Sequence, residues 1–265
     1  MPPPDPGELL AVAREAAAAA AELVHANRPG DLSVSTKSTG TDLVTDMDRG
    51  SESLIREVIS ARRPGDAIVG EEEGGEVGGS GVTWWVDPID GTTNYVYDHP
   101  GYAVSVAAWL DGSPFVGVVE DPTHSRTYWA SEGRGAFCNG ERLELREPPP
   151  LAEMLVATGF GYQPARRGAQ GRVVAELLPR VRDIRRMGAA AVDLCSVASG
   201  RVDAYYEVGL SQWDLAAGIV VASEAGAAVG SIDGGEVRPG SVLVCHPARM
   251  DELSAMLLEI GADRV

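Results

Sequence analysis

The sequence predicts an α/β (α+β) protein whose sheets and helices form layers, with an antiparallel-rich N-terminal half and a mixed-sheet α/β C-terminal half. Three observations support this fold class. Apolar segments of strand length follow one another across residues 82–131, separated by short turns. Strand-like and helical segments alternate across residues 155–260. The length of 265 residues suits two closely packed halves, and the composition shifts near Glu147-Pro148-Pro149-Pro150, so we expect halves at 1–147 and 148–265.

The N-terminal half is expected to begin with two helices. The first covers residues 8–27, contains a run of six alanines with high helix propensity, and should end near Arg28-Pro29-Gly30. A short extended piece at 42–45 leads into a second helix over 46–61, where apolar residues recur at helical spacing. Apolar segments then predict strands at 67–70, 82–86, 102–110, 114–121 and 127–131.

The C-terminal half is expected to alternate between short strands and helices. The apolar patterns predict strands at 155–158, 184–186, 204–207 and 241–245. They predict helices at 170–178, 190–199, 214–225 and 248–260. This alternation is typical of α/β proteins whose helices cover a sheet.

Charge and cysteine content exclude several classes of partner. The net charge of −17, from 22 basic and 39 acidic residues, repels nucleic acid and anionic membranes. It also repels phosphorylated substrates unless cations intervene. The three cysteines are widely spaced and form no CxxC motif, which indicates reduced thiols in a cytoplasmic protein. The first residues lack a basic segment, and the alanine run is flanked by charges, so neither a signal peptide nor a membrane span is expected.

Acidic residues gather where strands or loops are expected to meet helices. The clusters are DLVTDMD at 42–48, Glu71 with Glu72, Asp87 with Asp90, and Asp214. Because no histidine or cysteine accompanies them, these oxygen ligands favour Mg²⁺, Mn²⁺ or Ca²⁺ over zinc. Asp87 and Asp90 can both face one cleft across the intervening proline, and the Ile89 carbonyl offers a further oxygen. The clusters therefore predict a site for divalent cations.

A glycine turn directly follows Asp90. We expect Gly91-Thr92-Thr93 to start a short helix, with Asp90 or Thr92 as its cap. Backbone amides at such a turn favour phosphate. Phosphate and two metal ions in one site allow a water to be activated and a leaving oxygen to be stabilised. The pattern therefore predicts metal-assisted hydrolysis of a phosphate ester.

These motifs together resemble the inositol monophosphatase family, within the lithium-sensitive, Mg²⁺-dependent phosphatase superfamily. The matching segments, in chain order, are DLVTDMD (42–48), VGEE (69–72), WVDPIDGTTN (85–94) and WDLAAG (213–218). The resemblance covers essentially the whole chain. It implies a layered αβαβα sandwich, a homodimer, a small phosphate monoester as substrate, and two or three Mg²⁺ ions, with Mn²⁺ as a substitute.

The resemblance also implies roles for individual residues. The implied metal ligands are Glu71, Asp87 and the Ile89 carbonyl for the first ion, and Asp87, Asp90 and Asp214 for the second. Glu71 would also help to hold a weaker third ion and the attacking water. Asp48 and Thr92 would orient that water, with the threonine hydroxyl accepting its proton. Asp90 and the amides of Gly91 and Thr92 would lie against the phosphate.

Substrate choice depends on two segments of the C-terminal half. RMGAAAVDLC (186–195) resembles the segment that contacts the inositol ring, here through Gly188, Ala189 and Ala190. DAYYEVG (203–209) places Glu207 where a carboxylate accepts hydrogen bonds from ring hydroxyls. The sequence departs from the family at Ala189, where threonine or serine is common. The expected substrate is inositol 1-phosphate, with tolerance for other sugar and polyol phosphates.

Other interpretations stay open. A sibling phosphatase would act on histidinol phosphate, fructose 1,6-bisphosphate or 3′-phosphoadenosine 5′-phosphate. A non-enzymatic alternative is a module that binds the transcription machinery. Asp42 and Asp46 favour roles as caps or salt-bridge partners, and Lys37 is either near the site or solvated. Arginines at 180, 182, 185 and 186 border an interface or the substrate's approach, or form a solvated face.

Overall fold

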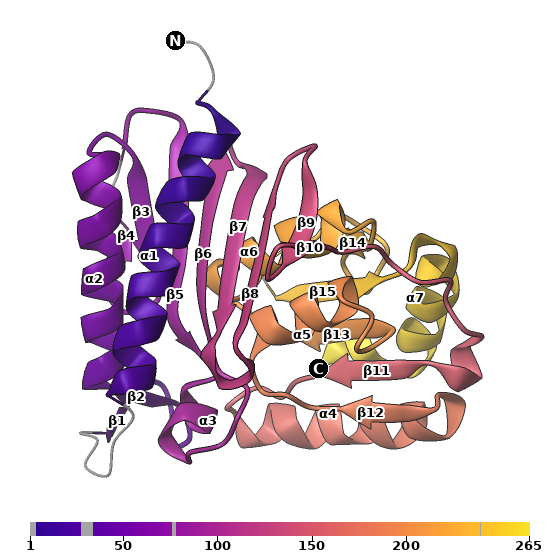
Figure 1. Ribbon diagram of the computed structural model, residues 1–265. Helices are drawn as coiled ribbons and strands as arrows, with labels where there is room; N and C mark the ends of the chain where they lie inside the picture. Colours follow the sequence, from indigo (N-terminus) through magenta and orange to yellow (C-terminus); the bar gives the residue numbers. More distant parts are fainter. Residues whose placement is uncertain (1–3, 28–33, 76–77, 239) are drawn as a thin grey trace.

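The computed structural model describes residues 4–27, 34–75, 78–238 and 240–265 and forms a five-layered αβαβα sandwich (Figure 1). Two N-terminal helices cover the outer face of an eight-stranded sheet. Two further helices fill the space between this sheet and a five-stranded sheet, and two more cover the far face of the second sheet. The layered fold expected from the sequence is confirmed.

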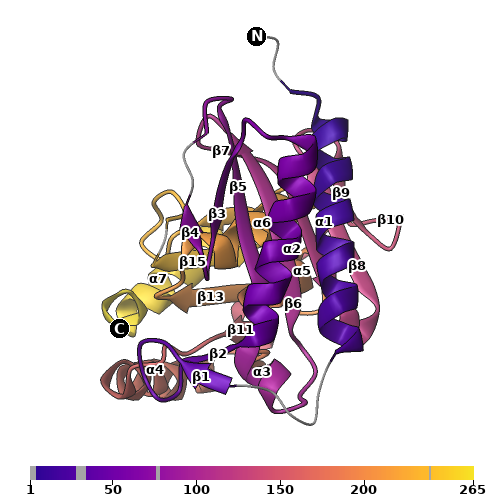
Figure 2. The same cartoon turned by 90° about the vertical axis from the view of Figure 1, so that its left-hand side faces the viewer.

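The outer helix layer consists of α1 (Pro6–Ala26) and α2 (Asp46–Arg62), which run side by side across the first sheet (Figure 2). Small and apolar residues on one face of α1 pack against the sheet, and four alanines of the run, Ala16, Ala17, Ala20 and Ala21, are buried there. A short antiparallel pair, β1 (Val34–Thr36) and β2 (Leu43–Thr45), leads into α2. Both helices lie where the sequence predicts them; residues 28–30, expected to end the first, lie outside the described residues.

The first sheet has the strand order β10-β9-β8-β7-β6-β5-β3-β4. Every neighbouring pair is antiparallel except β3 and β5, so the N-terminal half is antiparallel-rich as expected. The strands are β3 (Ala67–Gly70), β4 (Gly74–Gly75), β5 (Val82–Asp90), β6 (Ala103–Leu110), β7 (Ser113–Asp121), β8 (Arg126–Ser131), β9 (Gly135–Cys138) and β10 (Glu141–Arg142). Strand β5 continues beyond the predicted end at residue 86 because its pairing with β6 resumes at Asp90 after a register shift.

The second sheet has the strand order β12-β11-β13-β15-β14 and is mixed, with parallel pairing around β11 and antiparallel pairing around β15. Its strands are β11 (Leu155–Thr158), β12 (Asp183–Arg185), β13 (Ala204–Val208), β14 (Ala228–Gly230) and β15 (Ser241–Cys245). Helices α4 (Pro164–Leu177) and α7 (Met250–Glu259) cover its outer face. The start of α4 precedes the predicted residue 170 because Pro164 occupies a first-turn position, while Gly168 obscures the helical pattern.

The middle layer contains α5 (Ala190–Ala198) and α6 (Gln212–Glu224). Residues Leu215–Ala222 of α6 are all buried, because one face packs on the first sheet and the other on the second. Both sheets share this layer, and the predicted division at residue 147 stays a prediction. The helix α6 thereby brings the C-terminal half against strands of the N-terminal half.

Two further properties bear on the expected environment of the protein. The cysteines Cys138, Cys195 and Cys245 are free thiols, and the last two are buried. Within the described ranges, no helix is both long enough and apolar enough to cross a bilayer.

Candidate active site

A cavity of about 420 Å³ opens where the end of β5 meets the first turns of α5 and α6. Its lining from the N-terminal half includes Lys37, Asp42, Glu71, Asp87, Ile89, Asp90, Gly91 and Thr92. Its lining from the C-terminal half includes Gly188, Ala189, Ala190, Glu207 and Asp214. Every site residue predicted from the sequence therefore borders this one cavity except Asp48, which lies behind Thr92. Their individual roles stay predictions.

The irregular end of β5 places its two aspartates. Between Asp87 and Asp90 the pairing with β6 shifts register, because Pro88 has no N–H for the ladder. The Ile89 N–H instead donates to the Asp87 carboxylate, 3.1 Å away. The Ile89 carbonyl accepts a hydrogen bond from the Thr92 hydroxyl at 3.1 Å. The strand end therefore holds two carboxylates and one carbonyl at the cavity.

The turn after Asp90 corrects one expectation. Neither Asp90 nor Thr92 caps the short helix α3 (Thr92–Val96); Gly91 occupies the N-cap position, with φ of 91° and no side-chain cap. A side chain at Gly91 would be strained by this φ and would approach the carbonyls of Gly101 and Gly188 to 3.1 Å. The Asp90 carboxylate instead accepts from the amides of Ala190 and Ala191, at 3.1 and 2.6 Å. It thus caps α5 from the other half of the chain.

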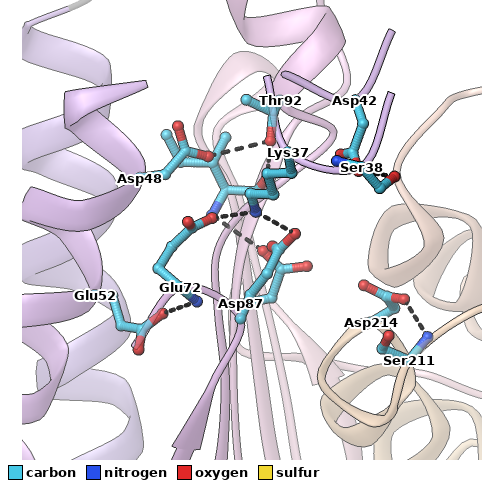
Figure 3. Close-up of polar contacts among 12 residues, drawn as sticks. Lys37, Ser38, Asp42, Asp48, Glu52, Glu72, Asp87, Thr92, Ser211 and Asp214 are labelled. Carbon is cyan, nitrogen blue, oxygen red and sulfur yellow. Dashed lines mark hydrogen bonds and ion pairs between the residues drawn. The ribbon is translucent and has the colours of Figure 1, made fainter. Parts of the chain in front are cut away.

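Asp48 and Thr92 form the pair expected from the sequence. The Thr92 hydroxyl is 3.1 Å from the Asp48 carboxylate, which is fully buried (Figure 3). Asp48 also accepts from the Thr45 amide at 2.7 Å and the Thr45 hydroxyl at 2.6 Å, in a capping box that starts α2. Burial raises the pKa of Asp48, although these hydrogen bonds oppose the shift. The first turn of α2 therefore fixes the carboxylate behind the threonine.

Lys37 provides a positive charge at the cavity. Its ammonium group, which the β1–β2 loop carries, lies 2.8 Å from Glu71 and also pairs with Glu72 (Figure 3). Burial opposes the charged form of Lys37, but the two glutamates outweigh it and raise its pKa. Of the two readings left open by the sequence, the structure favours the lysine near the site. Its charge partly offsets the acids of the N-terminal wall.

The carboxylates of the site are electrostatically frustrated. Burial raises the pKa values of Glu71, Asp87 and Asp214, and the neighbouring acidic charges add to the shifts. Burial likewise raises the pKa of Asp90 to about 7, although the amides of Ala190 and Ala191 lower it. Buried carboxylates of this kind are stable as anions only beside a positive charge. One lysine does not supply enough charge for the whole group.

The donor chemistry fits a hard divalent cation. Carboxylate and carbonyl oxygens without nitrogen or sulfur ligands are typical of Mg²⁺ and Mn²⁺ sites. In the parts of the chain that the structure describes, no three histidine, cysteine, aspartate or glutamate side chains are already gathered tightly enough to hold an ion. Glu71 lies beside Asp87 and pairs with Lys37 at 2.8 Å, while Asp90 and Asp214 accept hydrogen bonds from backbone amides of the C-terminal half. Small side-chain movements would bring these acids together around a cation.

The opposite wall comes from the C-terminal half. Asp214 lies in the first turn of α6 and accepts from the Ser211 amide at 2.6 Å (Figure 3). On β13, the Glu207 carboxylate accepts from the Tyr205 hydroxyl at 2.7 Å, while burial raises its pKa. Gly188 and Ala189 form the turn before α5 and leave room for a ligand. This wall therefore combines two acids with small residues.

The sequence did not single out Tyr162 and Arg166, which line the cavity. Arg186 lines it too, in agreement with the reading that placed it at the substrate's approach. Arg186 was assigned to a basic patch with three other arginines, but those three pair instead with surface acids, namely Glu259, Glu153 and Asp183. Arg186 is the first residue of the ring-contacting segment 186–195, which distinguishes it from the other three. As expected, Asp42 accepts from Ser38 and Asp46 pairs with Arg49, so both serve local structure.

Comparison with known proteins agrees with the arrangement of these residues. The model of the inositol monophosphatase family matches residues 5–260. An inositol-1-monophosphatase of Mycobacterium leprae is 42% identical over 282 aligned positions, covering 97% of this chain and 96% of that protein. A Nus factor SuhB of Pasteurella multocida is 40% identical and covers 85% of this chain and 86% of its own. The solved structure of Mycobacterium tuberculosis SuhB is similar with a TM-score of 0.82, at 38% identity over 98% of this chain and 99% of that chain.

Proposed function

This chain belongs to the inositol monophosphatase family and is accordingly a phosphatase, and we propose that it hydrolyses inositol 1-phosphate to inositol and phosphate in a Mg²⁺-dependent reaction. The observation that carries the proposal is the ring of carboxylates around one cavity, of which Asp87 and Asp90 are buried and Glu71 and Asp214 are partly buried. In a chain with a net charge of −17, such a cavity attracts a phosphate ester only when cations offset the acids.

We propose the following ligand sets for these cations. Glu71, Asp87 and the Ile89 carbonyl would hold a first ion, and Asp87, Asp90 and Asp214 a second, with Glu71 contributing to a weaker third. Bound Mg²⁺, or Mn²⁺ in its place, would supply Lewis-acid stabilisation of charge and a lowered pKa for water. The acids are contributed by both halves of the chain, so the cavity exists only when α6 is packed against the first sheet.

Thr92 and Asp48 are suited to orient the attacking water. The Thr92 hydroxyl can donate to Asp48 or to the Ile89 carbonyl, both 3.1 Å away. Because its hydrogen is directed at either of these acceptors, an oxygen lone pair stays free to accept a proton from a water in the cavity. Asp48 would stabilise the hydroxyl in this orientation and accept the hydrogen bond that strengthens as the water reacts.

The substrate would lie between the two walls. We propose that Asp90 and the amides of Gly91 and Thr92 border the phosphate. Gly188, Ala189 and Ala190 would contact the ring, and Glu207 would accept hydrogen bonds from its hydroxyls. The alanine at 189 lacks the hydroxyl that is common there in the family, which supports tolerance for other sugar and polyol phosphates.

A substrate panel tests the proposal. Phosphate release is measured from inositol 1-phosphate, histidinol phosphate, fructose 1,6-bisphosphate and 3′-phosphoadenosine 5′-phosphate, each with Mg²⁺ and with a chelator. We expect inositol 1-phosphate to give the highest kcat/KM, and the chelator to abolish release. Preference for another substrate would keep the metal chemistry but overturn the assignment of the ring-contacting wall.

A second candidate function is binding to the transcription machinery. The similarity to a protein named Nus factor SuhB favours it. A pull-down with purified RNA polymerase, using the wild-type chain and Asp214→Asn, separates the two functions. Binding that survives in a variant without phosphatase activity would support a role independent of catalysis. If neither form binds RNA polymerase, hydrolysis stays the single supported function.

We further propose that the enzyme is a cytoplasmic homodimer that binds neither nucleic acid nor membranes. The family resemblance supports the dimer, and the free thiols and acidic charge support the other two assignments. Light scattering coupled to size-exclusion chromatography measures the oligomeric state directly.

A further inference from the structure

Glu52, near the middle of α2, is a buried carboxylate outside the cavity lining. Its exposed fraction is 0%. Burying a carboxylate is costly unless hydrogen bonds or a cation compensate for the lost water. Its position on the face of α2 that meets the first sheet therefore calls for specific partners.

The partners of Glu52 are the amides of the turn that carries Glu71. The Glu72 N–H donates to one carboxylate oxygen at 2.8 Å (Figure 3). The Glu73 N–H donates to the other at 3.1 Å. Gly70 leaves room for this contact, because a β-carbon there would lie 2.1 Å from the Glu52 carboxylate. The Glu52 side chain thus binds the two backbone amides that directly follow Glu71.

Arg56, one helical turn further along α2, makes additional contacts with Glu52 and with the same turn. Its Nε donates to Glu52 at 2.9 Å, and its guanidinium also donates to the Gly74 carbonyl at 2.5 Å. Residues Glu72 to Gly74 are therefore tied to α2 by an amide pair, a carbonyl and a charge pair. With Arg56 beside it, the Glu52 charge is both paired and hydrogen-bonded.

The same helix face also carries Asp48, because residues four apart lie one turn apart on one side of a helix. Asp48, Glu52 and Arg56 thus form a row along α2. One rigid helix connects the pair proposed to orient the water with the turn proposed to hold a metal. Glu71 also pairs with Lys37 at 2.8 Å, so the position of this turn decides whether its carboxylate faces the cavity.

We propose that Glu52 is a positioning residue that fixes the turn after β3 so that Glu71 faces the cavity, and thereby sets the affinity of the site for Mg²⁺. This inference rests on the proposed function, because it assumes that Glu71 is a metal ligand. Without the Glu52 carboxylate, the turn would lose both amide contacts, and Glu71 would be free to move away from the cavity.

Calorimetric titration of Mg²⁺ into the substrate-free protein tests the proposal without relying on turnover. For Glu52→Gln we expect affinity to fall roughly 10- to 100-fold, as for other residues that support metal ligands from behind. Arg56→Lys should show a smaller loss, because Glu52 keeps both amides. Glu57→Gln, an exposed change on the same helix, is the matched control and should bind as wild type.

A second readout separates positioning from general destabilisation. Hydrogen exchange at the Glu72 and Glu73 amides should accelerate in Glu52→Gln, while exchange in β6 and β7 stays as in the wild type. Mg²⁺ affinity equal to wild type in Glu52→Gln, combined with its loss in Glu71→Gln, would overturn the positioning role and leave the proposed function intact. A wild-type protein that binds no Mg²⁺ would overturn both. If Glu52→Gln does not fold, unchanged affinity in Arg56→Lys overturns the inference.

Discussion

The two walls of the cavity differ in burial and in how their side chains are held. On the N-terminal side, Asp87 in the wall and Asp48 behind it are exposed by 1% and 0%, and each accepts a hydrogen bond from its own segment. On the C-terminal wall, the small residues of the turn before α5 stand beside the half-exposed side chains of Tyr162 and Arg166. The N-terminal wall is mainly charged, whereas the C-terminal wall combines the acids Glu207 and Asp214 with small residues and a partly exposed rim.

This difference separates chemistry from substrate choice. A reaction that depends on fixed charges requires side chains that cannot rearrange, and the capping box of α2 and the strand end of β5 provide them. Recognition of the alcohol part of a substrate requires shape, which small residues and a partly solvated rim can adjust. Changes to the acids of the metal site, including Asp214, should therefore lower turnover, while changes to the small residues of the second wall should alter affinity and preference.

The largest expected effect is on the first wall. Replacing Asp90 by Asn removes a negative charge from the proposed metal site, and we expect kcat to fall by roughly 10³-fold or more. The fold should persist, because removing one of several repelling charges offsets the weakened cap on α5. Steady-state kinetics and thermal unfolding measure the two effects, with the exposed Asp251→Asn as control. Near-normal turnover in Asp90→Asn would contradict the role of Asp90 as a metal ligand needed for catalysis.

Replacing Thr92 by Val tests the water-orienting pair. Valine keeps the shape of the side chain but removes the hydroxyl that bonds Asp48, so kcat should fall by roughly 10²-fold with little change in KM. Thr93→Val changes the neighbouring residue in the same way and should retain activity. A loss expressed in KM alone would assign Thr92 to substrate binding instead.

Replacing Asn94 by Ala should loosen the ring-contacting turn of the C-terminal wall, although Asn94 itself belongs to the N-terminal half. The Asn94 amide donates to the carbonyls of Gly101 and Met187, both at 2.7 Å, and so ties the turn before α5 to α3. Its loss should raise KM for inositol 1-phosphate roughly 10-fold, because the ring-contacting turn becomes mobile. Mg²⁺ affinity should not change. A fall in Mg²⁺ affinity with unchanged KM would show that Asn94 supports the metal site and not the ring-contacting turn.

The smallest expected effect is on stability as a function of pH. The pKa of Asp90 is raised from an ordinary value near 3.8 to about 7, so the folded state binds more protons than the unfolded state between these values. Stability should therefore fall as pH rises from about 4 to about 7. With a chelator, the thermal midpoint should decrease over this range, by roughly 2–4 °C for each kcal/mol lost. Saturating Mg²⁺ should reduce the change of the thermal midpoint with pH. A midpoint that rises with pH would contradict the raised pKa of Asp90.

Local patterns account for most of the fold and for the identity of the acids. Long periodic segments such as α1 and β6 were predicted within a few residues. Short strands such as β9 and β14 were missed, because pairing with neighbours rather than local sequence defines them. The α4 helix was shortened in the prediction since a glycine interrupts its pattern.

What the sequence could not provide is the set of long-range partners. Asp90 was expected to cap its own helix, yet it binds amides 100 and 101 residues away. Glu52 bonds a turn 20 residues further on, and nothing in its local pattern distinguishes it from a surface glutamate. Such contacts depend on how the layers pack, which a local pattern does not encode.

Anomalous diffraction from crystals soaked in Mn²⁺ would show whether the cavity binds divalent cations, because it locates ions without depending on turnover. We expect strong peaks inside the cavity, bordered by Glu71, Asp87 and the Ile89 carbonyl and by Asp90 and Asp214. Peaks confined to exposed acids, with none inside the cavity, would contradict the assignment of the N-terminal wall as a metal site.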